Sequence, residues 1–330
     1  MNSANPQPIV PQVSRLAEVF LDSLVGDTTV SRDTVRGYSF EVNRFAIFLV
    51  EKCKLQFVNQ LGVKHIHSHL IELSNRGLSK TSRAKALNAI RAWNRWLARA
   101  GHVQHSVAEL VDPIRPSDHL PNVPSPTQIS IMLDLADKSK TGWPARDKAI
   151  CEVLYGCGAA NRELRALNID DIQFKNQQIV IRAKGGRKQR FAPIGNAAAD
   201  ALRIYIEERS AWLEKKQVVS PALFVNEELR GSGKPGFEAR VSSLSLQHTV
   251  KRIAILAGLP KDVTARTLRW ACGAHMLNQG ADIEIVKTLL GISGTRMTGV
   301  LQRLRTAPLE AAMDRTHPRA TLKPDVRGVS

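Results

Sequence analysis

The sequence predicts a mainly α-helical protein of two domains, the second of which also contains a small antiparallel sheet. Three observations indicate this fold class. Apolar residues recur at helical spacing through most of the first hundred residues. A proline-rich stretch then interrupts the pattern, and beyond it further helical segments flank one β-like patch. At 330 residues the chain is long enough for each domain to bury its own core.

The first domain is expected over residues 12–110, after a polar segment, 1–11, without periodicity. Its four helices are predicted at about 13–24, from a cap at Ser31 or Asp33 to about Leu49, at about 58–73, and at 79–100. On the fourth helix, basic residues lie outside the apolar stripe; these are Arg83, Lys85, Arg91, Arg95 and Arg99. The pattern therefore indicates a compact helical domain with one basic face.

A connector follows at 111–128, where five of the chain's sixteen prolines occur. Proline fixes φ and removes a backbone donor, so this stretch favours extended chain. The second domain is assigned to 129–305, and 306–330 is a tail of weak periodicity. Helices are expected at about 126–138, 144–157, 195–215, 243–257, 266–280, 282–290 and 296–305. The β-like residues between Ile172 and Ile194 flank a polar hairpin tip, AKGGRKQR.

Composition indicates a polyanionic partner. The formal net charge is +17 and the pI is about 10.1, and clustered Lys and Arg gain affinity by releasing counterions from phosphates. A merely soluble basic protein is the alternative, and charge alone does not separate DNA from RNA. The beginning of the sequence has no secretory pattern, and no apolar run approaches the roughly 18 residues of a membrane span. The four scattered cysteines are typical of a reducing compartment, so a cytoplasmic location is expected.

Four segments, taken in order, resemble the tyrosine recombinase (phage integrase) family. YGCGAANRELRALNIDDI (155–172) resembles the box Y-x-x-G-L-R-x-x-E-L, and IVIRAKGGRKQRFAPI (179–194) the hairpin with the family's lysine. ARTLRWACGAHMLNQGADIEIVKTLLG (265–291) resembles the H-x-L-R-H box, and LPNVPSPTQISIML (120–133) the connector. The resemblance implies an Xer-like architecture, with a helical, SAM-like core-binding domain and a mixed α+β catalytic-type domain. It also implies a clamp on double-stranded DNA that assembles with other recombinase subunits.

The resemblance assigns a residue of this chain to each position that the family uses for strand cleavage. The first arginine position holds Ala160 and the hairpin lysine is Lys184. The H-x-L-R box gives Arg266 and Arg269. The assisting His or Trp position after L-L-G holds Ile292, and the nucleophilic tyrosine position holds Leu301. The family's next His aligns with Trp270. The chain's only tyrosines are Tyr38, Tyr155 and Tyr205, so a slipped register does not supply the nucleophile.

These replacements predict a DNA-binding protein that does not cleave DNA by itself. Phosphoryl transfer to a protein hydroxyl needs a nucleophile in line with the phosphate and cations on its oxygens. The remaining cations are expected to grip phosphate; these are Lys184, Arg187, Lys188, Arg190, Arg266 and Arg269, with an ordinary solvated basic surface as the alternative. Four cations of the fourth helix in the first domain are also predicted to bind DNA; these are Arg83, Lys85, Arg91 and Arg95. No cofactor is expected. The interpretation is an accessory or regulatory subunit in recombination or integration of a mobile element.

Other features of the sequence suggest alternative functions. His65, His67 and His69 form HxHxH, but with no third ligand nearby they are interpreted as DNA-facing or solvated rather than as a metal site. Trp93 and Trp96 are expected in a helical core. An active recombinase with an unorthodox nucleophile remains an alternative; Ser293, Thr295 and Thr298 are the candidates. A repressor or a replication or partition factor derived from a recombinase is another, and RNA binding is disfavoured by an aromatic content of 5%.

Overall fold

The computed structural model describes residues 11–27, 29–115, 120–138, 142–182, 189–228 and 239–305. The chain divides into two compact units, Met1–His119 and Leu120–Ser330, and each is considered by itself. The prediction of a mainly helical protein with a small antiparallel sheet is confirmed. Within the described ranges, no helix is long and apolar enough to cross a membrane.

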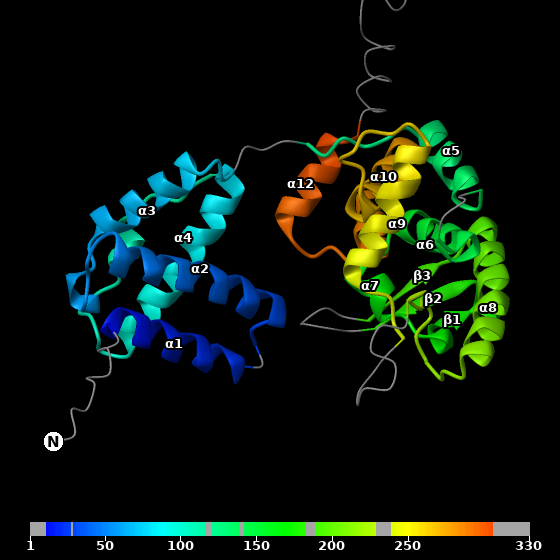
Figure 1. Ribbon diagram of the computed structural model, residues 1–330. Coiled ribbons are helices and arrows are strands. Elements are labelled where there is room, and N and C mark those ends of the chain that lie inside the picture. The colour runs from blue at the N-terminus through cyan, green and yellow to red at the C-terminus, as the bar shows by residue number, and fades with distance from the viewer. Residues whose placement is uncertain are drawn as a thin grey trace, which may run out of the picture. The chain divides into compact units, whose positions relative to one another are not determined.

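Unit 1 is helical throughout its described part (Figure 1). Its elements are α1 (Gln12–Val25), α2 (Arg32–Glu51), the 3₁₀ turn η1 (Val58–Gln60), α3 (Val63–Asn75), α4 (Lys80–Arg99) and the 3₁₀ turn η2 (Val107–Leu110). The Ser31 and Ser79 side chains accept hydrogen bonds from backbone N–H groups and so cap α2 and α4. Trp93, which is fully buried, lies in the core with Phe45, as predicted.

One predicted helix of unit 1 is wrong in its first part. Instead of one helix over about 58–73, the chain forms η1, breaks, and restarts as α3. Leu61 and Gly62 adopt extended backbone between the two elements. Gly62 then caps α3, because its N–H donates to Nδ1 of His65 over 3.0 Å. The apolar periodicity continues through this break. For that reason the sequence pattern did not predict that the helix is interrupted between η1 and α3.

Unit 2 combines eight helices and three strands within the described residues. The helices are α5 (Pro126–Ala136), α6 (Pro144–Gly156), α7 (Asn161–Ala166), α8 (Asn196–Lys216), α9 (Ser243–Leu256), α10 (Ala265–Asn278), α11 (Ile283–Leu290) and α12 (Thr295–Arg303), and the 3₁₀ turns are η3 (Ile169–Asp171) and η4 (Phe174–Asn176). Pro126 occupies the first turn of α5, where its missing N–H costs no hydrogen bond. Residues 126–128 of the expected connector are therefore helical.

The sheet is antiparallel and has the order β1–β2–β3. Its strands are β1 (Ile172–Gln173), β2 (Gln178–Ile181) and β3 (Arg190–Pro193), and Ile179 pairs with both Ile172 and Ala192. Ile179 and Ile181 point into the core, as the period-2 pattern requires. Of the predicted hairpin tip, 183–190, residues 183–188 lie outside the described residues, and Arg190 begins β3.

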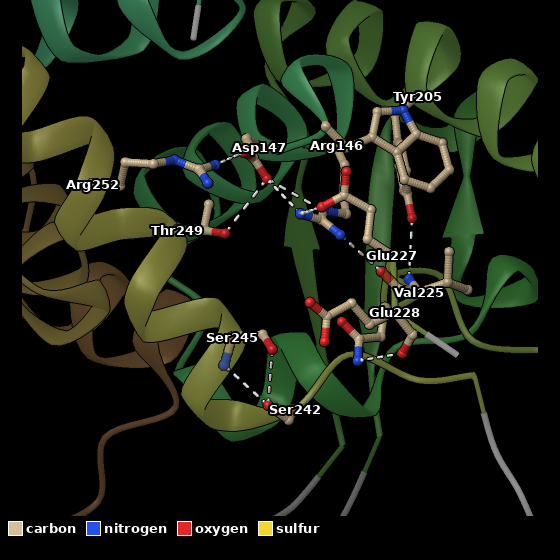
Figure 2. A network of polar contacts seen from close by, with 12 residues as sticks. Arg146, Asp147, Tyr205, Val225, Glu227, Glu228, Ser242, Ser245, Thr249 and Arg252 are labelled. Atoms are coloured by element: carbon tan, nitrogen blue, oxygen red, sulfur yellow. Dashed lines mark hydrogen bonds and ion pairs between the residues drawn. The ribbon is translucent and has the colours of Figure 1, made fainter. Parts of the chain in front are cut away.

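Helix α6 passes through the middle of unit 2 and is buried along most of its length. Its Asp147 carboxylate is fully buried and accepts from Arg146 at 3.1 and 3.2 Å, from Thr249 at 3.4 Å, and from Arg252 (Figure 2). Burial raises the pKa of Asp147, and the two guanidinium groups oppose that shift. This network joins α6 to α9, and Arg146 also donates to the Val225 carbonyl. It fixes the frame around which the candidate site is built.

Candidate functional site

Three charged side chains meet where the resemblance places the catalytic centre. Arg269, on α10, and Arg190, on β3, both contact the carboxylate of Glu163 on α7. The Arg190 distances to Glu163 are 2.9 and 3.0 Å, and the Arg269 distance is 3.4 Å. All three side chains are at most 10% exposed. This cluster, called the Arg269 centre below, is a closed ion network inside unit 2.

Local structure places Glu163 at the middle of this centre. Ala160 is the residue before α7, and its backbone N–H donates to Glu163 over 2.8 Å. Burial alone would raise the pKa of Glu163, but hydrogen bonds from Arg190 and from the Ala160 N–H, with the charges of both arginines, lower it on balance. Glu163 is therefore a carboxylate at neutral pH.

Both arginines also satisfy the end of α11. The last carbonyls of a helix have no partner within it. Arg190 donates to the Leu289 carbonyl over 2.8 Å, and Arg269 donates to the Leu290 carbonyl and to the Gly158 carbonyl, the latter over 2.6 Å. A positive charge at this position is also favoured by the helix dipole. The two guanidinium groups thus hold α11, α7 and α10 together.

The glycines beside the centre permit this close packing. Gly158 and Gly291 have φ of +56° and +59°, in the left-handed region. A Cβ at Gly158 would lie 2.2 Å from the Leu290 side chain, and one at Gly291 would lie 3.2 Å from Arg190. The backbone therefore approaches the centre more closely than any larger residue would allow.

Leu301, which the sequence analysis assigned to the nucleophile position, is a core residue. It is fully buried on α12. A Cβ added to Gly273 on α10 would lie 2.8 Å from the Leu301 side chain, so the leucine fills the space that this glycine leaves. Ile292 is half-buried and packs against the same core. Neither side chain has a hydrogen-bonding group to offer.

The three tyrosines lie elsewhere. Tyr205 is fully buried, and its hydroxyl donates to the Leu223 carbonyl and accepts from the Val225 N–H. Tyr155 is hydrogen bonded to His275 over 3.0 Å. Tyr38 belongs to unit 1. Burial raises the pKa of the Tyr155 hydroxyl, and it raises the pKa of Tyr205 to about 12.

Of the other cations predicted in unit 2, Arg266 is exposed, and its guanidinium lies 6.0 Å from the centroid of the Trp270 ring. Trp270 itself is buried. Lys184, Arg187 and Lys188 belong to the hairpin tip and lie outside the described residues. The structure therefore places Arg190 and Arg269 together. Arg266 lies on the surface of α10, the helix that also carries Arg269.

In unit 1 the four predicted cations of α4 lie in different environments. Lys85 is exposed and Arg83 half-buried near the start of the helix. Arg91 donates to the carbonyls of Ala108 and Val111, and Arg95 forms a 3.4 Å ion pair with Glu109. The Arg91 guanidinium is thus hydrogen bonded within unit 1.

A surface groove between α2 and α4 was missed by sequence reasoning. Its lining residues come from the N-terminal half of each helix; they are Asp33, Thr34, Arg36, Gly37, Tyr38, Phe40, Glu41, Lys85 and Asn88. Arg36 and Lys85 are exposed. Because the two helices meet only in the folded unit, no single segment of sequence contains this signal. We call this surface the α2–α4 face.

The interpretation of the HxHxH segment is wrong for His69. Its side chain is 2% exposed and packs 5.0 and 4.8 Å from the ring centroids of Phe45 and Phe48. Neither ring nitrogen has a hydrogen-bond partner. Burial, followed by the charges of Arg44 and Arg76, lowers the pKa of His69 to about 4. In the described part of the chain, no group of three or more His, Cys, Asp or Glu could hold a metal ion.

Comparison with known proteins identifies the class to which this fold and centre belong. Residues 125–305 match the model of the phage integrase family, and residues 17–101 match that of the phage integrase N-terminal SAM-like domain. The chain therefore belongs to the phage integrase, or tyrosine recombinase, family, whose members act in DNA recombination.

Similar individual proteins include Xer recombinases. The tyrosine recombinase XerD of Corynebacterium glutamicum is 30% identical over 312 residues, which cover 92% of this chain and 98% of that protein. XerC of Syntrophus aciditrophicus is 27% identical over 303 residues, covering 89% and 94%.

Solved structures with the same fold include a XerH site-specific recombinase bound to palindromic difH substrate in a post-cleavage complex. It has a TM-score of 0.73 and 16% identity, with 93% of this chain and 98% of that chain covered. A lambda integrase dimer bound to a COC′ core site has a TM-score of 0.65 and 13% identity, covering 89% and 77%.

Proposed function

We propose that this protein is a DNA-binding tyrosine recombinase homologue that occupies recombination sites without cutting DNA itself. The observation that carries the proposal is Leu301. At the position where the family has its nucleophile, this chain has a fully buried leucine packed against Gly273. A methyl-bearing side chain cannot attack phosphorus, and the hydroxyls of Tyr155 and Tyr205 are engaged in other contacts.

The chain also has fewer side chains that can bind the phosphate during cleavage. One preorganised donor contributes about 2.7–4 kcal/mol to transition-state stabilisation, equivalent to about 10²–10³ in rate. Ala160 and Ile292 would each remove such a donor. Arg269, which is present, is committed to Glu163 and to two backbone carbonyls. Cleavage by this chain alone is therefore expected to be undetectable.

DNA binding rests on the exposed cations. The net charge of +17 favours a phosphate backbone as partner. In unit 1 the α2–α4 face presents Arg36 and Lys85, with Thr34 and Asn88 as polar neighbours. In unit 2, Arg266 and the predicted hairpin cations Lys184, Arg187 and Lys188 would contact backbone phosphate. The similar XerH recombinase is bound to palindromic difH substrate, and the lambda integrase dimer is bound to a COC′ core site.

The proposed role is that of an accessory or regulatory subunit, in the cytoplasm, within a mixed assembly of recombinases on one DNA element. A first experiment measures binding of the purified chain to DNA that flanks its own gene, by gel shift at increasing salt. Specific, salt-dependent complexes are expected. Failure to bind any such site better than random duplex would contradict the proposal.

A second experiment addresses chemistry, using nicked suicide substrates that trap a covalent protein–DNA ester. We expect no covalent adduct from this chain alone. An adduct mapped to Ser293, Thr295 or Thr298 would instead establish the active recombinase with an unorthodox nucleophile. Stoichiometry on DNA separates the remaining alternative, because a repressor or a replication or partition factor would occupy one duplex without synapsis.

A further inference from the structure

Each end of the segment that joins the two units is fastened to its own unit by a side chain. At the unit 1 end, Arg91 on α4 donates from Nε to the Ala108 carbonyl over 3.2 Å and from Nη2 to the Val111 carbonyl. Ala108 and Val111 are buried. Ile114 still packs against the unit 1 core. The chain thus stays attached to unit 1 as far as Ile114.

At the unit 2 end, His275 on α10 holds the chain. Its Nε2 lies 3.0 Å from the Pro124 carbonyl, and its Nδ1 lies 3.0 Å from the Tyr155 hydroxyl. A carbonyl only accepts, so Nε2 must donate, and in the neutral ring Nδ1 then accepts from the tyrosine hydroxyl. Val123 packs against the unit 2 core, and Ser125 caps α5 directly afterwards. The chain is therefore attached to unit 2 from Val123 onward.

We propose that Arg91 and His275 are positioning residues that limit the tether between the units to at most the residues between Ile114 and Val123. This inference rests on the proposed DNA-binding function. From Ile114 to Val123 there are nine Cα–Cα steps, which span at most about 32 Å when fully extended. The tether is thus much shorter than the 111–128 connector that proline content alone predicts.

A short tether matters because it makes binding by the second unit intramolecular. Once one unit holds the duplex, the effective concentration of the other falls roughly as the −3/2 power of tether length. Release of both ends, back to η2 and forward to α5, would raise this upper limit from eight residues, 115–122, to fifteen, 111–125. The overall affinity for DNA is then expected to fall about threefold, without loss of any contact to DNA.

The first test measures tether length directly. Two spin labels are attached in the full chain, through Glu18→Cys on α1 and Glu207→Cys on α8, in a Cys53→Ser background. We expect Arg91→Gln and His275→Phe each to broaden the distribution of distances between the labels, and the double variant to broaden it most. Arg99→Gln, which removes an exposed charge from the same helix as Arg91, is the matched control and should leave the distribution unchanged.

An insertion of about eight Gly and Ser residues between Asp118 and His119 lengthens the tether without altering either unit. It should reproduce the broadening even if a point variant folds poorly. The contrary outcome is that the insertion broadens the distance distribution while Arg91→Gln and His275→Phe leave it unaltered. If those two variants also melt like the parent, this result overturns the assignment of Arg91 and His275 as the fastening residues.

The second test measures DNA affinity against salt. We expect Arg91→Gln and His275→Phe each to weaken binding up to about twofold, and the double variant and the insertion up to about threefold, with the salt slope unchanged. A direct phosphate contact by Arg91 would lower the slope by about one and leave the distance distribution narrow, and that outcome contradicts the proposal. An equal loss in Arg91→Gln and Arg99→Gln would do the same. If the parent chain binds no DNA, the proposed function fails, but the distances between the labels still test whether Arg91 and His275 limit the length of the tether.

Discussion

The Arg269 centre and the α2–α4 face both contain arginine or lysine side chains, yet these charges lie in different environments. In the centre, Arg190 and Arg269 are buried, paired with Glu163 and hydrogen bonded to the end of α11. On the α2–α4 face, Arg36 and Lys85 are exposed. The comparison teaches that a cation is available to phosphate only where the fold leaves its side chain exposed, as it does for Lys85 even with Glu41 on the same face.

The largest expected effect concerns the centre. Glu163→Gln would leave Arg190 and Arg269 buried beside a neutral amide, and loss of one partner from a buried ion network costs about 3–5 kcal/mol. We therefore expect unit 2 to lose most of its stability in urea denaturation. The exposed pair Glu284–Lys287 serves as the control, and Glu284→Gln should change the free energy of unfolding by less than about 0.5 kcal/mol. Equal effects of the two substitutions would show that the centre is not a structural ion network.

The second effect tests the packing beside the centre. Leu301→Ala should destabilise unit 2 by about 2–5 kcal/mol, because it leaves a cavity at a fully buried site. Gly273→Ala should cost about 1–3 kcal/mol, because its new methyl group would lie 2.8 Å from Leu301 and 2.9 Å from Leu290. In the double variant the methyl partly fills the cavity, so the loss should be smaller than the sum. Additive losses in thermal unfolding would contradict direct packing of this pair.

The third effect lies in unit 1 and depends on pH. The pKa of His69 is about 4 in the folded chain against an ordinary 6.5. Above pH 6.5 the ring is neutral in both states and contributes no pH dependence. As pH falls from 6.5 toward 4 the unfolded state binds the proton first, so about 3 kcal/mol of stability is lost across that window. His69→Leu should flatten the stability of unit 1 between pH 7 and pH 4.5. An unchanged slope would mean that His69 is not buried as described.

The smallest effect concerns the exposed face. Lys85→Ala should weaken DNA binding by a similar factor for specific and random duplexes and should lower the salt slope by about one, because it removes a single phosphate contact. The stability of unit 1 should change little, since Lys85 is exposed. Gel shifts over a range of salt concentrations provide the measurement. If the slope is unaltered, DNA does not contact this face through Lys85.

Much of the fold could be predicted from the sequence, because it depends on local patterns. The capping serines Ser31 and Ser79, the apolar stripe of α4 and the alternation in β2 each carry their own signal. The break between η1 and α3 could not be predicted, because Leu61 continues the apolar periodicity while its backbone turns extended. The family resemblance drew attention to Arg190 and Arg269, which the structure brings together on Glu163. That these arginines bind phosphate stays a prediction.

The local environment of single residues was harder to predict. His69 looked like one of three solvated histidines, but α2 brings Phe45 and Phe48 against its ring. Arg91 looked like its exposed neighbours on α4, and only the return of the chain at Ala108 and Val111 gives it partners. Arg190 and Glu163 lie 27 positions apart, so their pairing is visible only after the sheet has formed. Each of these differences arises from tertiary contacts.

The fit between Gly273 and Leu301 has a consequence for the history of this protein. Tyrosine in place of Leu301 would put a bulky aromatic ring beside Gly273, where α10 packs closely against an aliphatic side chain. Under the proposed function, gain of cleavage would therefore need compensating substitutions in α10 and α11 as well as an arginine at 160. Under the proposed function, the present form is separated from an active ancestor by several simultaneous mutations, so it would be maintained or lost as a binding protein and not readily returned to catalysis.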